Sequence, residues 1–156
     1  MVRSFAEEHG VLVLSIDSRD RTWDIIVDDV GPDVAFLDRA LRSTFERFAV
    51  DPSRVAISGF SDGASYALSI GLANGELFKD VVAFSPGFSL PPEIHGKPRV
   101  FVSHGTKDAV LGVDHTSRRI VPRLERAGYD VVYREFDGPH TVPSEIVRTA
   151  FVWLLS

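Results

Sequence analysis

The sequence of 156 residues contains no cysteine, which excludes disulfide bonds, thiolate metal sites and a cysteine nucleophile. It also lacks an excess of positive charge, because 17 Lys and Arg residues stand against 22 Asp and Glu residues, a formal net charge of −5. Proteins that bind nucleic acid need a basic surface for the phosphates, so we expect no nucleic-acid partner. No group of His, Asp and Glu residues has the spacing of a metal site. We therefore expect neither a metal nor a cofactor.

Long hydrophobic runs are absent as well. No apolar run approaches the ~18 residues of a membrane span, so we expect none. The N-terminal MVRSFAEEHG places Glu7 and Glu8 where a signal peptide needs an apolar core, which predicts a cytoplasmic location. With 44% hydrophobic and 25% charged residues, the composition is ordinary for one soluble globular domain. We expect a single domain over residues 1–156.

What the chain does have is an alternation of short apolar runs with helical patterns. Most of the runs are continuously apolar, which is typical of parallel strands covered by helices on both faces. Strands are expected at 11–16, 54–58, 81–84, 99–103 and 131–136, and helices at about 32–48, 64–73, 117–127 and from about 143 onward. This order predicts an α/β fold, a three-layer and mostly parallel sheet of about five strands flanked by helices.

The segment RVAISGFSDGASYAL, residues 54–68, places the motif GFSDG at 59–63 between a strand pattern and a helix pattern. A strand–turn–helix corner of this kind projects the serine hydroxyl above the sheet. The two glycines permit so sharp a turn, because a Cβ at either position would clash. The corner also aims the Asp62 amide and the helix N-terminus at Ser61, where they favour a developing oxyanion. Ser61 is therefore a candidate nucleophile, and a purely structural turn is the alternative.

A nucleophilic serine needs a histidine base and an acid that orients the base. In this architecture the acid precedes the histidine along the chain, and each follows a strand. Asp108 in RVFVSHGTKDAV and His140 in VVYREFDGPHTVP meet both conditions. Both loops fall at the carboxyl ends of parallel strands, where open α/β sheets gather their ligands. His104 as the base, and Asp114 or Asp137 as the acid, are the alternatives.

The segments GFSDGASYALSIGLANGELF, AFSPGF, VFVSHGTKDAVL and YREFDGPHTVP resemble the α/β-hydrolase superfamily. In particular they resemble its phospholipase/carboxylesterase-like and dienelactone-hydrolase-like serine esterases, over about residues 5–153. The resemblance implies a Ser61 nucleophile, a His140 base and an Asp108 orienting acid. It also implies that the Asp62 amide donates to the oxyanion.

The resemblance further implies that SIDSRDRTWD forms part of the pocket wall, with Trp23 near the acyl or alcohol group. Other loop residues can supply apolar walls, although each can equally be ordinary core: Phe60, Phe88, Leu90, Val110 and Leu111. Such walls fit a small-molecule ester with a short acyl chain better than a charged substrate. We therefore predict a serine carboxylesterase that works through an acyl-enzyme. The alternatives are a thioesterase or lipase-like hydrolase with the same triad, and an inactive remnant that acts as a binding domain.

The chain departs from the superfamily at its beginning. The N-terminal strands and the His-Gly-containing loop that gives the second oxyanion donor have no counterpart. One missing strand normally lies between those expected at 11–16 and 54–58, so these must pair directly or a strand must come from another chain. The chain is either a minimal esterase that uses another amide, with one near Ser18 as the candidate, or part of a longer protein. An exposed apolar edge would also favour a homo-oligomer.

Overall fold

The structure, a computed structural model, describes residues 2–26 and 31–156. The chain divides into two compact units, Met1–Asp51 and Pro52–Ser156. That residues 1–156 act as a single domain stays a prediction. All three residues expected to form the catalytic triad belong to the second unit.

The second unit is built on a parallel sheet of four strands in the order β1-β2-β3-β4. The strands are β1 (Ala56–Phe60), β2 (Asp80–Phe84), β3 (Arg99–Gly105) and β4 (Val131–Phe136). Because all neighbours run parallel, the four carboxyl ends meet at the same edge of the sheet. The predicted α/β class with a parallel sheet is confirmed.

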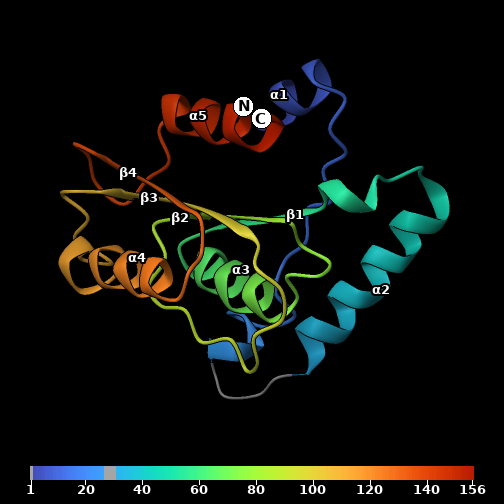
Figure 1. Ribbon diagram of the computed structural model, residues 1–156, viewed down its shortest axis with the longest axis horizontal. Coiled ribbons are helices and arrows are strands. Elements are labelled where there is room, and N and C mark those ends of the chain that lie inside the picture. The colour runs from blue at the N-terminus through green and yellow to red at the C-terminus, as the bar shows by residue number, and fades with distance from the viewer. Residues whose placement is uncertain (1, 27–30) are drawn as a thin grey trace. The chain divides into compact units, whose positions relative to one another are not determined.

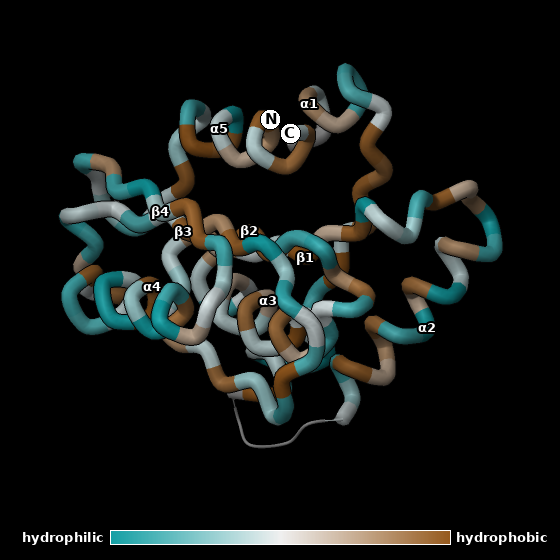
Figure 2. The backbone as a smooth tube through the Cα atoms, viewed as in Figure 1, coloured by the Kyte–Doolittle hydropathy of each residue, from teal (hydrophilic) through white to brown (hydrophobic). Residues whose placement is uncertain are grey.

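Helices cover both faces of this sheet. On one face lie α3 (Asp62–Ala73) and α4 (Ser117–Arg126), and on the other lies α5 (Ser144–Leu155), as Figure 1 shows. Residues 64–73 of α3 are all buried, so this helix is enclosed almost throughout its length. Helices on both faces explain why β2 (DVVAF) and β3 (RVFVSHG) are buried along nearly their whole length, and why brown stretches lie in the middle of the sheet in Figure 2.

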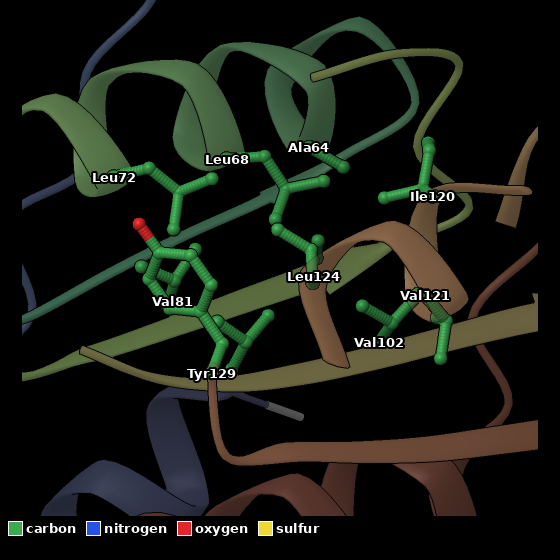
Figure 3. Packing of buried hydrophobic residues seen from close by; sticks show 11 residues of the cluster. Ala64, Leu68, Leu72, Val81, Val102, Ile120, Val121, Leu124 and Tyr129 are labelled. Carbon is green, nitrogen blue, oxygen red and sulfur yellow. The ribbon is translucent and has the colours of Figure 1, made fainter. Parts of the chain in front are cut away.

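Two hydrophobic cores follow from the alternation of side chains along each strand. Val81 points into the core beneath α3 and α4, while its neighbour Val82 points to the α5 side. The first core is shown in Figure 3 and contains Ala64, Leu68, Leu72, Val81, Ala83, Val100, Val102, Ile120, Val121, Leu124 and Tyr129. The second joins Val82 and Phe101 to Ile146 and Ala150 of α5. A hydrophobic core on each face thus holds the sheet whose carboxyl edge carries the three candidate residues.

The first unit contains α1 (Val2–Glu8), the 3-10 helix η1 (Asp24–Ile26) and α2 (Pro32–Arg47). Two buried carboxylates hold the start of α2. Asp24 Oδ2 accepts hydrogen bonds from the amides of Gly31 at 3.0 Å and Asp33 at 2.9 Å. Asp33 in turn accepts from the amides of Arg19 at 2.7 Å and Asp24 at 2.8 Å. A carboxylate at a helix N-terminus satisfies first-turn amides and favours the helix dipole.

The strand expected at 11–16 is wrong, because the described residues form no strand there. A strand needs a neighbouring backbone for its hydrogen bonds, and the sheet of the described residues contains β1 to β4 alone. Val11, Leu12, Val13 and Leu14 are 37–51% exposed. The strand expected at 54–58 begins later, at Ala56, because residues 52–54 form the 3-10 helix η2 (Pro52–Arg54).

Candidate active site

Ser61 lies at the corner where β1 ends and α3 begins, with φ 56° and ψ −121°. A positive φ is unusual for a residue other than glycine and costs free energy, so the surroundings must hold it. The Ser61 amide donates to the carbonyl of Phe84 at 2.9 Å, and the Ser61 carbonyl accepts from the amide of Ala64 at 3.0 Å. A Cβ on Gly59 would lie 2.1 Å from the carbonyl oxygen of Gly63. The glycine at 59 is therefore required by the close approach of strand and helix.

Three side chains from three loops form one hydrogen-bonded chain at the carboxyl edge. His140, after β4, has its Nε2 2.9 Å from Ser61 Oγ and its Nδ1 2.5 Å from Asp108 Oδ2. The side chain of Asp108, after β3, is fully buried, and that of His140 is 15% exposed. Because a carboxylate only accepts, Nδ1 carries the proton and Nε2 is left to accept the serine proton. The sequence reasoning selected these three residues, and the structure brings them together.

The second carboxylate oxygen of Asp108 is also fully engaged. Oδ1 accepts from the amides of Val110 at 2.9 Å and Leu111 at 2.8 Å. Burial by itself raises the pKa of Asp108, but the Leu111 amide, His140 and the Val110 amide together hold this pKa below its ordinary value. The carboxylate therefore stays ionised and fixed in orientation next to the histidine.

The predicted oxyanion donor Asp62 is the first residue of α3. Amides of the first turn point out of the N-terminus of a helix, where the dipole favours negative charge. Since Asp62 directly follows Ser61, its amide belongs to the same corner as the hydroxyl. The position suits an oxyanion donor, and this role stays a prediction.

The predicted wall residues come from both units of the chain. The Phe60 ring packs against the His140 ring with centroids 4.7 Å apart, and Phe60 is 40% exposed. Val110 is 68% exposed, and Leu111 is partly buried, both directly after the acid loop. Trp23 belongs to the first unit, and its place beside the substrate stays a prediction.

Phe88 is held by contacts that the sequence reasoning missed. Ser65 Oγ, on α3, accepts from the amides of Gly87 at 2.9 Å and Phe88 at 3.3 Å. Ser69, one turn further on, accepts from the amide of Leu90 at 3.0 Å. The two serines thus fix the loop after β2 on the helix that follows the nucleophile. Ser65 and Ser69 are four residues apart and therefore lie on the same face of α3, and this spacing is the sequence pattern that could have indicated a shared role.

The alternative acids and base have other partners. Asp114 binds Arg118 at 2.7 Å, and Asp137 forms an ion pair with Lys107 at 2.7 Å. His104 is completely buried in β3, and its Nε2 lies 3.1 Å from Asp108 Oδ2. It contacts the acid rather than the serine, a contact that the sequence reasoning did not foresee.

Residues 33–150 match the phospholipase/carboxylesterase family, and the chain belongs to this family. The match covers the corner at Ser61 and the loops that carry Asp108 and His140. Among curated proteins no match is found. The predicted resemblance to this branch of the α/β-hydrolase superfamily is confirmed.

Solved structures with the same fold include several that are esterases by name. The crystal structure of esterase PE8 is 32% identical with a TM-score of 0.68, covering 78% of this chain and 58% of that one. A carboxylesterase from Bacillus cereus is 22% identical, with a TM-score of 0.60, covering 78% and 60%. SOBER1 from Arabidopsis thaliana is 20% identical, with a TM-score of 0.62, covering 78% and 59%. The chain therefore spans less than two thirds of the length of these structures.

The described residues contain no group of three or more His, Asp or Glu side chains arranged to hold a metal ion. Within the same part of the chain, no helix has both the length and the apolar character to cross a membrane.

Proposed function

We propose that this chain is a serine carboxylesterase that hydrolyses short-chain carboxylic esters. The observation that carries the proposal is the continuous hydrogen-bonded chain from Ser61 Oγ through His140 to Asp108, at 2.9 and 2.5 Å. An adjacent base converts a serine hydroxyl into a nucleophile, and the acid keeps the imidazole in the useful tautomer. Membership of the phospholipase/carboxylesterase family supports the same chemistry.

The first half of the reaction forms an acyl-enzyme. Ser61 Oγ attacks the acyl carbon of the ester while His140 Nε2 takes the hydroxyl proton. The oxyanion of the tetrahedral intermediate is stabilised by the Asp62 amide and a second donor that the described residues do not identify. His140 then returns the proton to the leaving alkoxide, and the alcohol departs. Asp108 stays ionised and stabilises the imidazolium throughout.

The second half repeats these steps with water. His140 takes a proton from a water molecule, the hydroxide attacks the acyl carbon, and the carboxylic acid leaves as the proton returns to Ser61. The half-exposed Phe60 beside His140 and the exposed Val110 give the surroundings of the serine an apolar character. Short, uncharged acyl groups therefore suit this site as small-molecule substrates. A homo-oligomer and a cytoplasmic location stay predictions.

The direct test is hydrolysis of p-nitrophenyl acetate, butyrate and octanoate by the purified protein. Ser61→Ala, prepared identically, is the control for background hydrolysis. We expect activity that vanishes in the variant and falls from butyrate to octanoate. Equal rates in both proteins would overturn the proposal and favour the binding-domain alternative. Faster hydrolysis of matched thioesters than of oxygen esters would instead assign a thioesterase.

A further inference from the structure

His104 is a buried histidine for which the proposed mechanism has no task. It lies in β3 with 0% exposure, four residues before Asp108. Its Nδ1 is 2.7 Å from the Ser117 hydroxyl, and its Nε2 is 2.7 Å from the Leu111 carbonyl and 3.1 Å from Asp108 Oδ2. Every polar atom of the ring thus has a partner, and one of these partners is the proposed catalytic acid.

The partners decide where the ring proton lies. The Leu111 carbonyl and the Asp108 carboxylate only accept hydrogen bonds, so Nε2 of His104 must carry the proton. The Ser117 hydroxyl can donate, and it supplies the proton for the bare Nδ1 of a neutral ring. The fully buried Ser117 therefore selects the tautomer of His104 whose Nε2–H donates to the Leu111 carbonyl and lies 3.1 Å from Asp108 Oδ2.

The same N–H lies beside the Asp108 carboxylate. Two backbone amides, those of Val110 and Leu111, donate to Oδ1, His140 Nδ1 donates to Oδ2, and His104 Nε2 lies 3.1 Å from Oδ2. Leu111 joins His104 to the acid as well, since its carbonyl accepts from His104 and its amide donates to Asp108 Oδ1. Without His104, Oδ2 would be held only by the side chain that it is supposed to orient.

We propose that His104 is a positioning residue that fixes Asp108 Oδ2 at the point where it meets His140 Nδ1. The inference rests on the proposed function, since it concerns the alignment of the same three side chains. Misplacement of a reacting group by a fraction of an ångström lowers turnover without weakening substrate binding. His104 therefore acts on kcat, through Asp108 and His140, and leaves KM alone.

Two substitutions separate positioning from simple packing. In His104→Gln the longer amide can bring an N–H to the place of Nε2, so the donor to the Leu111 carbonyl beside Asp108 Oδ2 is retained. In His104→Asn the shorter amide reaches only the place of Nδ1, so the donor is lost while a polar partner for Ser117 remains. Both variants remove the same aromatic ring, which makes them a matched pair.

The measurements are kcat and KM for p-nitrophenyl butyrate and the rate constant for labelling Ser61 with a fluorophosphonate. We expect kcat and the labelling rate to fall roughly 10- to 100-fold in His104→Asn and to stay within about threefold of the parent in His104→Gln, with KM unchanged in both. Val100→Ala, in the same strand and also 0% exposed, is the packing control. It should lower thermal stability and leave kcat unchanged.

Ser117→Ala keeps the ring and removes only the hydroxyl that selects its tautomer. We expect kcat to fall at least about threefold with KM unchanged. This variant decides the question if His104→Asn does not fold. Full kcat in Ser117→Ala, or equal losses in His104→Asn and His104→Gln, would overturn the inference.

A further readout needs no turnover, so it keeps this inference distinct from the proposed function. The proton on His140 Nδ1, observed by NMR in the folded protein, reports directly on the hydrogen bond to Asp108. Its chemical shift should move in His104→Asn and return in His104→Gln. An inactive parent protein with this response would retain the positioning role and overturn the esterase. An active parent protein whose chemical shift is unchanged by both substitutions would support the esterase and overturn the positioning role.

Discussion

Two corners of the sheet share a positive φ at a serine and have very different side-chain surroundings. Ser61 follows β1 with φ 56°, and Ser85 follows β2 with φ 51°. Each serine amide donates to a carbonyl of the next strand, that of Ser61 to Phe84 at 2.9 Å and that of Ser85 to Ser103 at 2.7 Å. The two neighbouring strand ends thus share a positive φ and an amide hydrogen bond to the next strand.

The side chains of the two corners differ in access and in partners. Ser61 is partly exposed, and its hydroxyl meets His140. Ser85 is 0% exposed, and its hydroxyl has no hydrogen-bond partner among the described residues. A strained serine at a strand end is therefore not in itself a nucleophile. The corner becomes a candidate active site when a base reaches the hydroxyl and a helix N-terminus begins beside it.

The sharpest test of this comparison removes each hydroxyl in turn. Ser61→Ala should lower kcat for p-nitrophenyl butyrate by about 10⁴-fold or more, because the triad acts as a unit. Ser85→Ala should leave kcat within about twofold and stability unchanged or slightly raised, since it removes an unsatisfied buried hydroxyl. Parallel steady-state kinetics and thermal unfolding check both. A loss of activity in Ser85→Ala with intact folding would erase the distinction between the corners.

The glycines of the two corners should differ almost as strongly. Gly59→Ala would place a Cβ 2.1 Å from the Gly63 carbonyl oxygen, so strand and helix must separate. The free energy of unfolding should fall by about 3 kcal/mol or more, or the protein should not fold. A Cβ on Gly87 would meet its nearest atoms, in Leu111 and Ser65, at 3.5 Å, an ordinary contact.

Gly87→Ala should accordingly change the free energy of unfolding by less than about 1 kcal/mol. Urea unfolding of the two variants beside the parent protein measures the contrast. Similar stability of both alanine variants would show that the Ser61 corner is looser than its geometry indicates.

The loop after β2 is held by hydrogen bonds to α3, and removing them should lower the free energy of unfolding less than Gly59→Ala does. Ser65→Ala removes the acceptor of the Gly87 and Phe88 amides and should destabilise by about 1–3 kcal/mol. Ser69→Ala removes the acceptor of the Leu90 amide alone and should cost less. Chemical unfolding supplies the stabilities, and the ratio of butyrate to octanoate hydrolysis reports any movement of Phe88. A larger loss in Ser69→Ala would contradict the assignment.

Asp108, the acid beside the Ser61 corner, should make the free energy of unfolding depend on pH. Despite burial, the Leu111 amide, His140 and the Val110 amide hold the pKa of Asp108 below its ordinary value. Such a carboxylate stabilises the fold above the ordinary Asp pKa of about 4, and this stabilisation is lost as the pH falls through the lower folded-state pKa.

Urea unfolding of the parent protein and of Asp108→Asn, at a series of pH values, isolates this contribution. The advantage of the parent should shrink as the pH is lowered below about 4. An advantage that grows toward acid would mean that the Asp108 pKa is raised.

Most strands of the second unit and its three candidate catalytic residues could be predicted from the sequence. Continuous apolar runs predicted β2, β3 and β4 close to their observed bounds, because both faces of these strands are covered. Sequence reasoning also selected Ser61, Asp108 and His140, because each chain position relative to a strand determines at which edge of a parallel sheet a side chain emerges. The run at 11–16 was misjudged, since apolar character shows β propensity but not the presence of a partner strand.

What the sequence by itself determined was the alternation of strands and helices and the residue types at the strand ends, since both depend on local pattern. Only the tertiary structure decided that His104 lies 3.1 Å from the Asp108 Oδ2 that His140 contacts, and that Ser65 holds the loop carrying Phe88. These contacts join segments from different elements, and their distances depend on how helices pack on the sheet. Pattern along a chain predicts which way a side chain points, while packing decides what it meets.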